Sequence, residues 1–185
     1  ATTNDAVKTA KNTGVETINN MNVPTTSATK DDAINAIKTA LADKKTAING
    51  TNLTAEEKST LVGQAQKLAD DAIANINKAT TNDAVKTAKN TGVETINNMN
   101  VPTTSATKDD AINAIKTALA DKKTAINGTN LTAEEKSTLV GQAQKLADDA
   151  IANINKATTN DAVKTAKNTG VETINNMNVP TTSAT

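Results

Sequence analysis

The chain repeats itself without a single substitution. Residues 79–156 are identical to residues 1–78, and residues 157–185 are identical to residues 1–29. A fixed period of this length is typical of arrays in which every repeat forms the same structural unit. Because the chain begins and ends within a repeat, we expect it to be part of a longer array.

The composition of one repeat favours thin helical bundles. Ala, Thr and Asn make up nearly half of it, whereas Val, Ile, Leu and Met make up only a fifth and aromatic residues are absent. A core of such small side chains requires closely approaching backbones, not a thick globular interior. The whole chain has 20 Lys plus Arg, 20 Asp plus Glu and no His. This balance argues against nucleic acid as a partner, since nucleic acid selects a net basic surface.

The chain also has no cysteine. This excludes disulfides, thiolate metal sites and thiol nucleophiles, and it fits an extracellular bacterial protein. No run of residues approaches the roughly 18 apolar residues that a transmembrane helix needs, so we expect no membrane insertion by this part of the protein.

Two segments of the repeat have clear helical patterns. Residues 30–49 are predicted to form a helix with a capping box at Thr29 and Asp32, ended by Gly50. Residues 55–78 are predicted to form the longest helix, with a capping box at Thr54 and Glu57. The apolar seams comprise Ile34, Ile37, Leu41 and Ile48 in the first helix, with Lys44 in the remaining heptad position, and Leu61, Ala65, Leu68, Ala72 and Ile76 in the second, widened by Val62, Ala69 and Ile73.

A third, weaker helix is predicted within residues 2–24. Its apolar positions are three or four residues apart, and Pro24 ends it. Gly14 lies in this stripe at a cost of about 1 kcal/mol relative to Ala. The glycine either lets a neighbouring helix approach closely, which we favour, or is simply tolerated. The stripe consists of Val7, Ala10, Gly14, Ile18 and Met21.

The connection between the longest helix and the next repeat decides where a module begins. Ile76 and Val85 are nine residues apart, which would place the apolar stripe on opposite sides of one continuous helix. Thr81 and Asn82 are also good N-caps, so we favour a turn. The predicted modules are then residues 30–107 and 108–185, each a three-helix bundle, and residues 1–29 are an orphan helix and linker from a preceding repeat. The alternative unit, residues 1–78, requires one long shared helix and leaves 157–185 as the orphan.

No catalytic, cofactor-binding or metal-ligating residue is predicted. Ser27 and Ser59 have no histidine to act as their base. The acidic pairs are adjacent along a helix and do not converge, so capping and solvation explain them better than catalysis or metal binding. Asn49 and Asn52 match the N-glycosylation pattern but are interpreted as a turn and a cap, and the lysines as a solvated face. The pairs are Asp31–Asp32, Glu56–Glu57 and Asp70–Asp71.

The stretches LTAEEK, ADDAIANINKATTNDAV and AKNTGVETI resemble a family of tandem helical repeats of unassigned function. These repeats occur in Gram-positive cell-wall-anchored surface proteins, including matrix-binding, accumulation and biofilm-associated adhesins. The resemblance covers the whole period. It implies an extracellular rod or stalk that carries an adhesive region away from the cell wall, and it carries over no ligand-binding residue.

The sequence therefore predicts an all-α, elongated rod of small three-helix bundles. We expect a non-enzymatic, monomeric spacer on a bacterial surface, whose partners are the neighbouring repeats of the same chain. The alternative function is a binding module in which the repeats themselves engage a host extracellular-matrix protein or one another during biofilm accumulation. A broad exposed apolar patch would favour that alternative.

Overall fold

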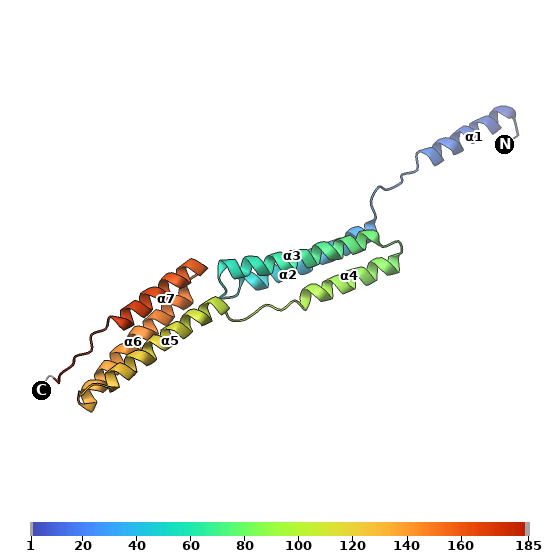
Figure 1. Cartoon of the computed structure of the whole chain (residues 1–185). Coiled ribbons are helices and arrows are strands. Elements are labelled where there is room, and N and C mark those ends of the chain that lie inside the picture. The colour runs from blue at the N-terminus through green and yellow to red at the C-terminus, as the bar shows by residue number, and fades with distance from the viewer. Residues whose placement is uncertain (1, 184–185) are drawn as a thin grey trace.

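The computed structural model describes residues 2–183 and shows an elongated chain of helices (Figure 1). The predicted all-α array of three-helix bundles is confirmed. Within the described range the helices are α1 (Asn4–Asn19), α2 (Ala28–Asn49), α3 (Ala55–Lys78), α4 (Asn82–Asn97), α5 (Ala106–Asn127), α6 (Ala133–Lys156) and α7 (Asn160–Asn175), with no strand among those residues.

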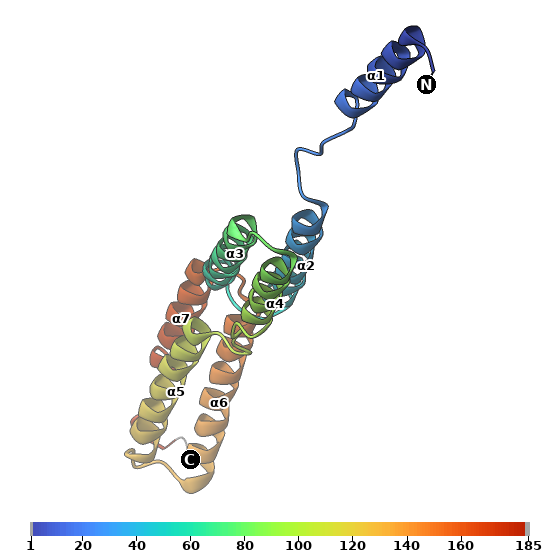
Figure 2. The ribbon, with the colours of Figure 1, turned by 90° about the vertical axis from the view of Figure 1, so that its right-hand side faces the viewer.

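Six of these helices form two bundles that follow one another along the rod. Helices α2, α3 and α4 pack against one another in pairs, and so do α5, α6 and α7. Figures 1 and 2 show the second bundle continuing from the end of the first where α2 turns into α3. Each bundle has its own apolar core, so the rod contains two separate hydrophobic units.

The start of α2 differs from the prediction. The helix begins at Ala28, and its N-cap is Ser27, whose hydroxyl accepts a hydrogen bond from the backbone amide of Lys30. The predicted capping box at Thr29 and Asp32 is therefore wrong. Ser27 precedes them in the chain and already satisfies an open amide of the first turn, so Thr29 lies inside the helix.

Helix α3 has the predicted bounds and the predicted capping box. The Thr54 hydroxyl accepts from the Glu57 amide at 3.2 Å, and the Glu57 carboxylate accepts from the Thr54 amide at 2.9 Å. The helix ends at Lys78 because Ala79 is extended, and Thr81 then caps α4. The chain thus turns between α3 and α4, as favoured from the phase of the apolar stripe, and no continuous helix forms there.

The core of each bundle is made of isoleucines surrounded by alanines. Ile37, Ile48, Ile76 and Ile96 are fully buried in the first bundle. A Cβ built on Gly92 would lie 2.6 Å from the Cβ of Ala72 and 2.7 Å from Cδ1 of Ile37. Gly92, the copy of Gly14 in this bundle, therefore allows the close helix approach that we favour, whereas a Cβ on Gly14 itself would meet no neighbour within 4 Å. Gly170 repeats this contact in the second bundle with Ala150 and Ile115.

Helix α1 has the same sequence as α4 and α7 but lies apart from both bundles (Figure 1). No residue of α1 is buried, and Gly14 has no neighbouring atom within 4 Å of a built Cβ. The large apolar side chains that are exposed in the described chain all belong to α1 and the segment after it. They are Val7, Val15, Ile18, Met21 and Val23.

Candidate functional site

The side chains considered above for chemistry lie at helix caps, on exposed helix surfaces and at the contact between the two bundles. Residues 2–183 contain no cluster of three or more Asp, Glu, His or Cys side chains that could hold a metal ion. Ser27 is a helix cap, and Asp71 forms an exposed ion pair with Lys67 at 3.0 Å. The pairs Asp31–Asp32 and Asp70–Asp71 thus lie on exposed helix surfaces, whereas Glu56 and Glu57 contact the second bundle.

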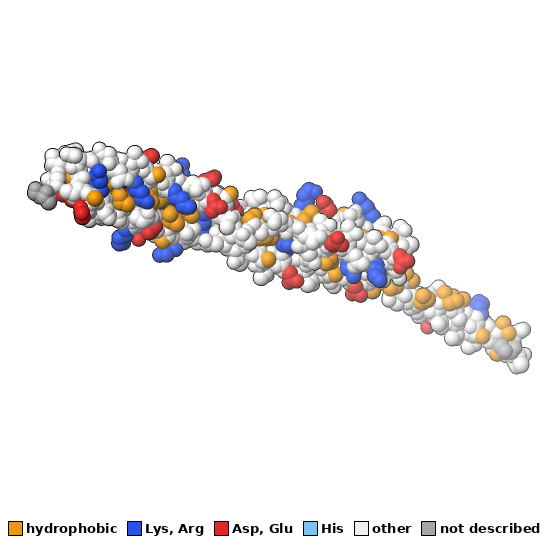
Figure 3. Space-filling view, turned by 90° about the horizontal axis from the view of Figure 1, so that it is seen from below, with side chains coloured by type: hydrophobic (Ala, Val, Ile, Leu, Met, Phe, Trp, Pro, Cys, Tyr) orange, Lys and Arg blue, Asp and Glu red, His pale blue; other side chains and the backbone are white. Residues whose placement is uncertain are grey.

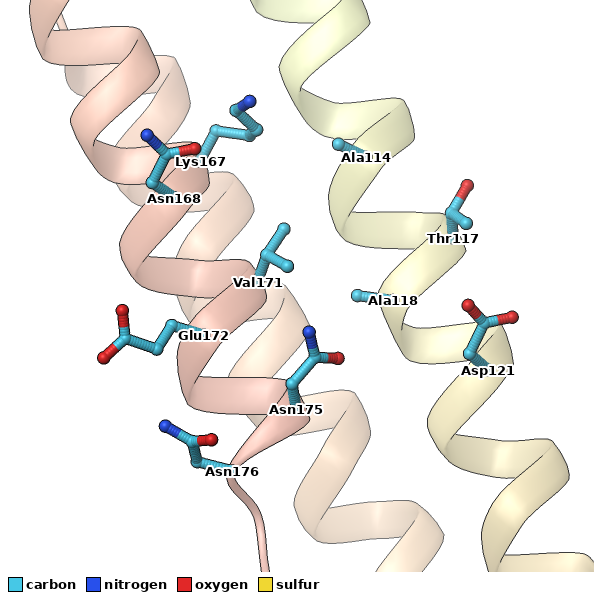
Figure 4. A pocket seen from close by; sticks show the side chains of 10 residues that line it. All are labelled: Ala114, Thr117, Ala118, Asp121, Lys167, Asn168, Val171, Glu172, Asn175 and Asn176. Carbon is cyan, nitrogen blue, oxygen red and sulfur yellow. The ribbon is translucent and has the colours of Figure 1, made fainter.

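A groove of the second bundle lies between α5 and α7 (Figure 4). Small side chains such as Ala114, Ala118 and Val171 form its floor, and the charged groups at its edges include Asp121 and Lys167. The first bundle has the same groove between α2 and α4. The charged side chains stand at separate positions along the rim, and Figure 4 shows no point at which they converge. The groove therefore has no polar cluster that would orient a small ligand.

Three lysines of each bundle cap the carboxyl ends of neighbouring helices. In the first bundle, Lys58 donates to the carbonyl of Asn49 at 3.0 Å, at the end of α2. Lys30 donates to the carbonyl of Asn77 at 2.8 Å, near the end of α3. Lys44 donates to the carbonyls of Asn97 and Met99, each at 3.0 Å, at the end of α4. Because open carbonyls and the helix dipole attract cations at this end, the three contacts fasten the helices together.

The interpretation of the lysines as a solvated face is therefore wrong for these three positions. Figure 3 shows many other blue and red side chains projecting from the surface, so the interpretation describes the remaining charges better. The helix packing brings together lysines and carbonyls that are far apart in the chain. Lys44 gave a signal in the sequence, because it occupies an apolar heptad position of α2.

Hydrogen bonds join the two bundles at two places. On the first bundle the contact comprises the α2–α3 turn and the first turn of α3. On the second bundle it comprises the start of α5 and the α6–α7 turn. The hydroxyl of Ser105 donates to Oε1 of Glu57 at 2.7 Å, and the amide of Thr107 donates to Oε2 at 3.3 Å. Glu57 thus binds the following bundle while it closes the capping box of its own helix.

The α6–α7 turn supplies the other half of this contact. The amide of Ala55 donates to the carbonyl of Thr158 at 2.8 Å. The amide of Asn160 donates to Oε1 of Glu56 at 3.0 Å, and the side chain of Asn52 donates to the carbonyl of Asn155 at 3.3 Å. Among the described residues, the buried side-chain atom without a hydrogen-bond partner, Oδ1 of Asn160, also lies here.

The contact shifts the pKa of two side chains, Glu57 and Lys108. Burial alone would raise the pKa of Glu57, but hydrogen bonds from Ser105, Thr54 and Thr107 outweigh it and lower the pKa to about 2. Burial lowers the pKa of Lys108, opposed by the charge of Glu57, and the Lys108 ammonium donates to the carbonyl of Asn155 at 2.9 Å. Glu57 therefore remains a carboxylate at neutral pH, which is the form that accepts these bonds.

The fold and this contact define a class of protein: a tandem array of three-helix bundles joined end to end. The chain belongs to the DUF1542 family, described as a domain of unknown function, which matches residues 29–104 and 107–182. No helix of the described residues combines the length and the apolarity needed to cross a membrane.

The relatives of the chain are extracellular matrix-binding proteins that are much longer than the chain itself. The chain is 33% identical over 141 residues, or 75% of its length, to extracellular matrix-binding protein EbhA of Staphylococcus aureus strain Mu3 and to extracellular matrix-binding protein ebh of strain JH9. It is equally similar to EbhA of strain Newman. The matched region spans only 1 to 4% of those relatives. No solved structure matches the chain. The chain thus consists of DUF1542 repeats and is similar to a small part of each of these matrix-binding proteins.

Proposed function

We propose that these repeats are a non-enzymatic spacer in a bacterial cell-surface adhesin. In this role the array projects an adhesive region away from the cell wall, and the number of repeats sets how far it reaches. The protein would then be extracellular and anchored to the cell wall. Identical repeats suit this task, since no copy needs a binding site of its own.

The observation that carries the proposal is the end-to-end order of the two bundles (Figure 1). A helix of about 24 residues is roughly 36 Å long, so each added repeat lengthens the rod by about that amount. Two further observations support a spacer. The groove has no convergent polar groups, and described residues 28–183 have no exposed large apolar side chain. The names of the relatives support a location at the cell surface.

Small-angle X-ray scattering on arrays of increasing repeat number tests the proposal. The maximum dimension should rise by about 35–40 Å for each repeat, and the scattering mass should stay that of a monomer. A compact domain of the same chain length would have a radius of gyration of about 16 Å by the usual scaling. A radius of gyration close to that compact value, or a maximum dimension that stops increasing with repeat number, would contradict the spacer role.

The alternative is that the repeats themselves bind a host matrix protein or a second array during biofilm accumulation. The name of the relatives, extracellular matrix-binding protein, favours this alternative. The lack of a broad apolar patch and of aromatic anchors on the bundles argues against it. Surface plasmon resonance of the chain over immobilised matrix proteins separates the two functions, because saturable binding would favour the binding module.

A further inference from the structure

We infer that, in each bundle, the end with the turn between the first and second helices is a docking surface for the bundle that follows. In the first bundle this is the α2–α3 end, and Glu57 is the residue that holds the two bundles together. The inference concerns how successive repeats are joined. It goes beyond the spacer proposal, because a binding array would use the same joint. The partner is the next copy of the same repeat in the chain, and its contacting parts are the N-terminus of its first helix and the turn between its second and third helices.

The two identical bundles provide an internal comparison. Thr54 is fully buried in the first bundle, whereas Thr132, the same residue in the second bundle, is exposed. Ser105 is 4% exposed at the joint, whereas its copy Ser27 is exposed at the start of the first bundle. Because the sequences are identical, neither difference arises from the repeat itself. Both arise from the presence of a neighbouring bundle.

The two ends are complementary in their open backbone groups. The first amides of a helix have no partner within that helix, and Ala55 and Asn160 are the first residues of α3 and α7. The Ala55 amide binds the Thr158 carbonyl in the α6–α7 turn, and the Asn160 amide binds the carboxylate of Glu56 in the first turn of α3. Each bundle therefore satisfies groups that the other leaves open.

Glu57 adds a second anchor on the other side of the joint. Its two carboxylate oxygens accept from the Ser105 hydroxyl and the Thr107 amide, at the start of α5. The connection between α4 and α5 therefore does not act as a flexible linker between the two bundles. Contacts to α5 and to the α6–α7 turn involve separate parts of the second bundle, so they restrict rotation as well as separation of the bundles.

The same features recur at the next joint of the array. Ser183, at the end of the described residues, donates to Oε1 of Glu135 at 2.9 Å, which repeats the contact between Ser105 and Glu57. The α5–α6 end of the second bundle thus has the same anchor in place. It is the surface on which a further repeat would dock.

Double electron-electron resonance on the full chain tests the inference. Spin labels at Lys67→Cys and Lys145→Cys report the distance between the bundles, since both side chains are 77% exposed and the chain has no other cysteine. The parent should give a narrow distance distribution. Glu57→Ala should widen this distribution at least twofold. A parent distribution as broad as that of a flexible tether would overturn the inference.

Glu135→Ala is the matched control. It removes the same capping box from α6 but affects no bundle that follows within the chain. The helical circular dichroism should change equally in both variants, and the distance distribution should widen only for Glu57→Ala. Equal widening in the two variants would overturn the inference, because loss of the cap alone would then explain it.

A milder pair of variants avoids the capping box. Asn52→Ala removes the hydrogen bond to the Asn155 carbonyl across the joint, and Asn130→Ala changes the same residue of the second bundle. Asn52→Ala should widen the distribution by less than Glu57→Ala, and Asn130→Ala should leave it unchanged. Identical distributions for both asparagine variants and the parent would exclude the α6–α7 turn from the docking surface.

Discussion

The hydroxyl of Ser105 donates a 2.7 Å hydrogen bond to the carboxylate of Glu57, a residue 48 positions earlier in the chain. Ser105 is also the N-cap of α5, where it accepts from the Lys108 amide at 3.0 Å. Glu57 likewise completes the cap of α3. Two helices in different bundles therefore begin at one shared pair of side chains, and a change at either residue affects both bundles.

Acid should loosen the joint only at very low pH. Glu57 has a folded pKa of about 2 against an ordinary value of 4.5, so its charged form contributes its full stabilisation above pH 4.5. That contribution decreases as the pH falls through this range and is lost below about pH 2. The charged groups near the carboxylate are the ammonium groups of Lys58 and Lys108 and the neighbouring Glu56 of α3.

The distance distribution between the bundles, measured from neutral pH to below the folded pKa of Glu57, checks this prediction. It should stay narrow down to about pH 4 and widen below about pH 3, while Glu57→Ala should be broad at every pH. Circular dichroism must show that the helices persist at each point. A joint that stays narrow below about pH 2 in folded protein would mean that the Glu57 charge contributes nothing.

Gly92→Ala should destabilise the first bundle. The added methyl group would lie within 2.7 Å of Ala72 and Ile37, and overpacking of this kind typically costs about 1–3 kcal/mol. Gly63→Ala is the control, since a Cβ there meets nothing within 4 Å and alanine stabilises an exposed helix by up to about 1 kcal/mol. In Gly92→Ala, the half of the urea-unfolding signal that comes from the first bundle should have a lower midpoint. Unchanged unfolding would mean that the helices separate easily.

Lys44→Met should weaken the attachment of α4. Methionine keeps the apolar stem but removes the hydrogen bonds to the Asn97 and Met99 carbonyls, which we expect to cost about 1–2 kcal/mol. Lys38→Met changes an exposed lysine of the same helix and should be nearly neutral. Urea unfolding of both variants checks the difference. Equal effects would show that the Lys44 contacts add no stability.

Ile37→Ala should cost about 2–5 kcal/mol, because Ile37 is fully buried in the first bundle. Leu68→Ala should cost less, since Leu68 is only partly buried. Ile18→Ala is the matched control: this isoleucine of α1 is 72% exposed, so its truncation should leave thermal unfolding of the bundles unchanged. A large loss of stability from Ile18→Ala would show that α1 packs against another part of the protein.

The boundaries of the folding unit remain a prediction, with modules at residues 30–107 and 108–185. Since Ser27 caps α2, a peptide of residues 27–104 should be compared with one of residues 1–78. The first contains α2, α3 and α4, whereas the second replaces α4 with α1, joined at the opposite end. Thermal unfolding should be sharper and higher for 27–104. A higher transition for 1–78 would contradict the predicted boundaries.

The helices and their turns could be predicted because their signals are local. The Thr54–Glu57 capping box and the phase between Ile76 and Val85 both lie within a few residues of the structure that they specify. The sequence predicts that α2 starts at residue 30, whereas the helix starts at Ala28. Ser27 and Thr29 are both suitable caps, and only the folded chain distinguishes them.

The joint could not be predicted because it depends on residues that the fold brings together. Glu57 has all the features of an ordinary capping residue in the sequence, and its second set of partners, Ser105 and Thr107, belongs to the next repeat. The lysine contacts have the same origin, since Lys30 of α2 and Asn77 of α3 meet only when these two helices pack. Spacing along one helix gives no information on such pairs.

The two ends of a repeat are unlike each other and complementary, which has a genetic consequence. Removing or duplicating any block that is one full period long, wherever the cut falls, rejoins the same two ends and leaves every remaining joint identical. A gain or loss of whole periods therefore changes the number of repeats without creating a new kind of contact. The length of such an array can change while the folding problem that each repeat solves stays the same.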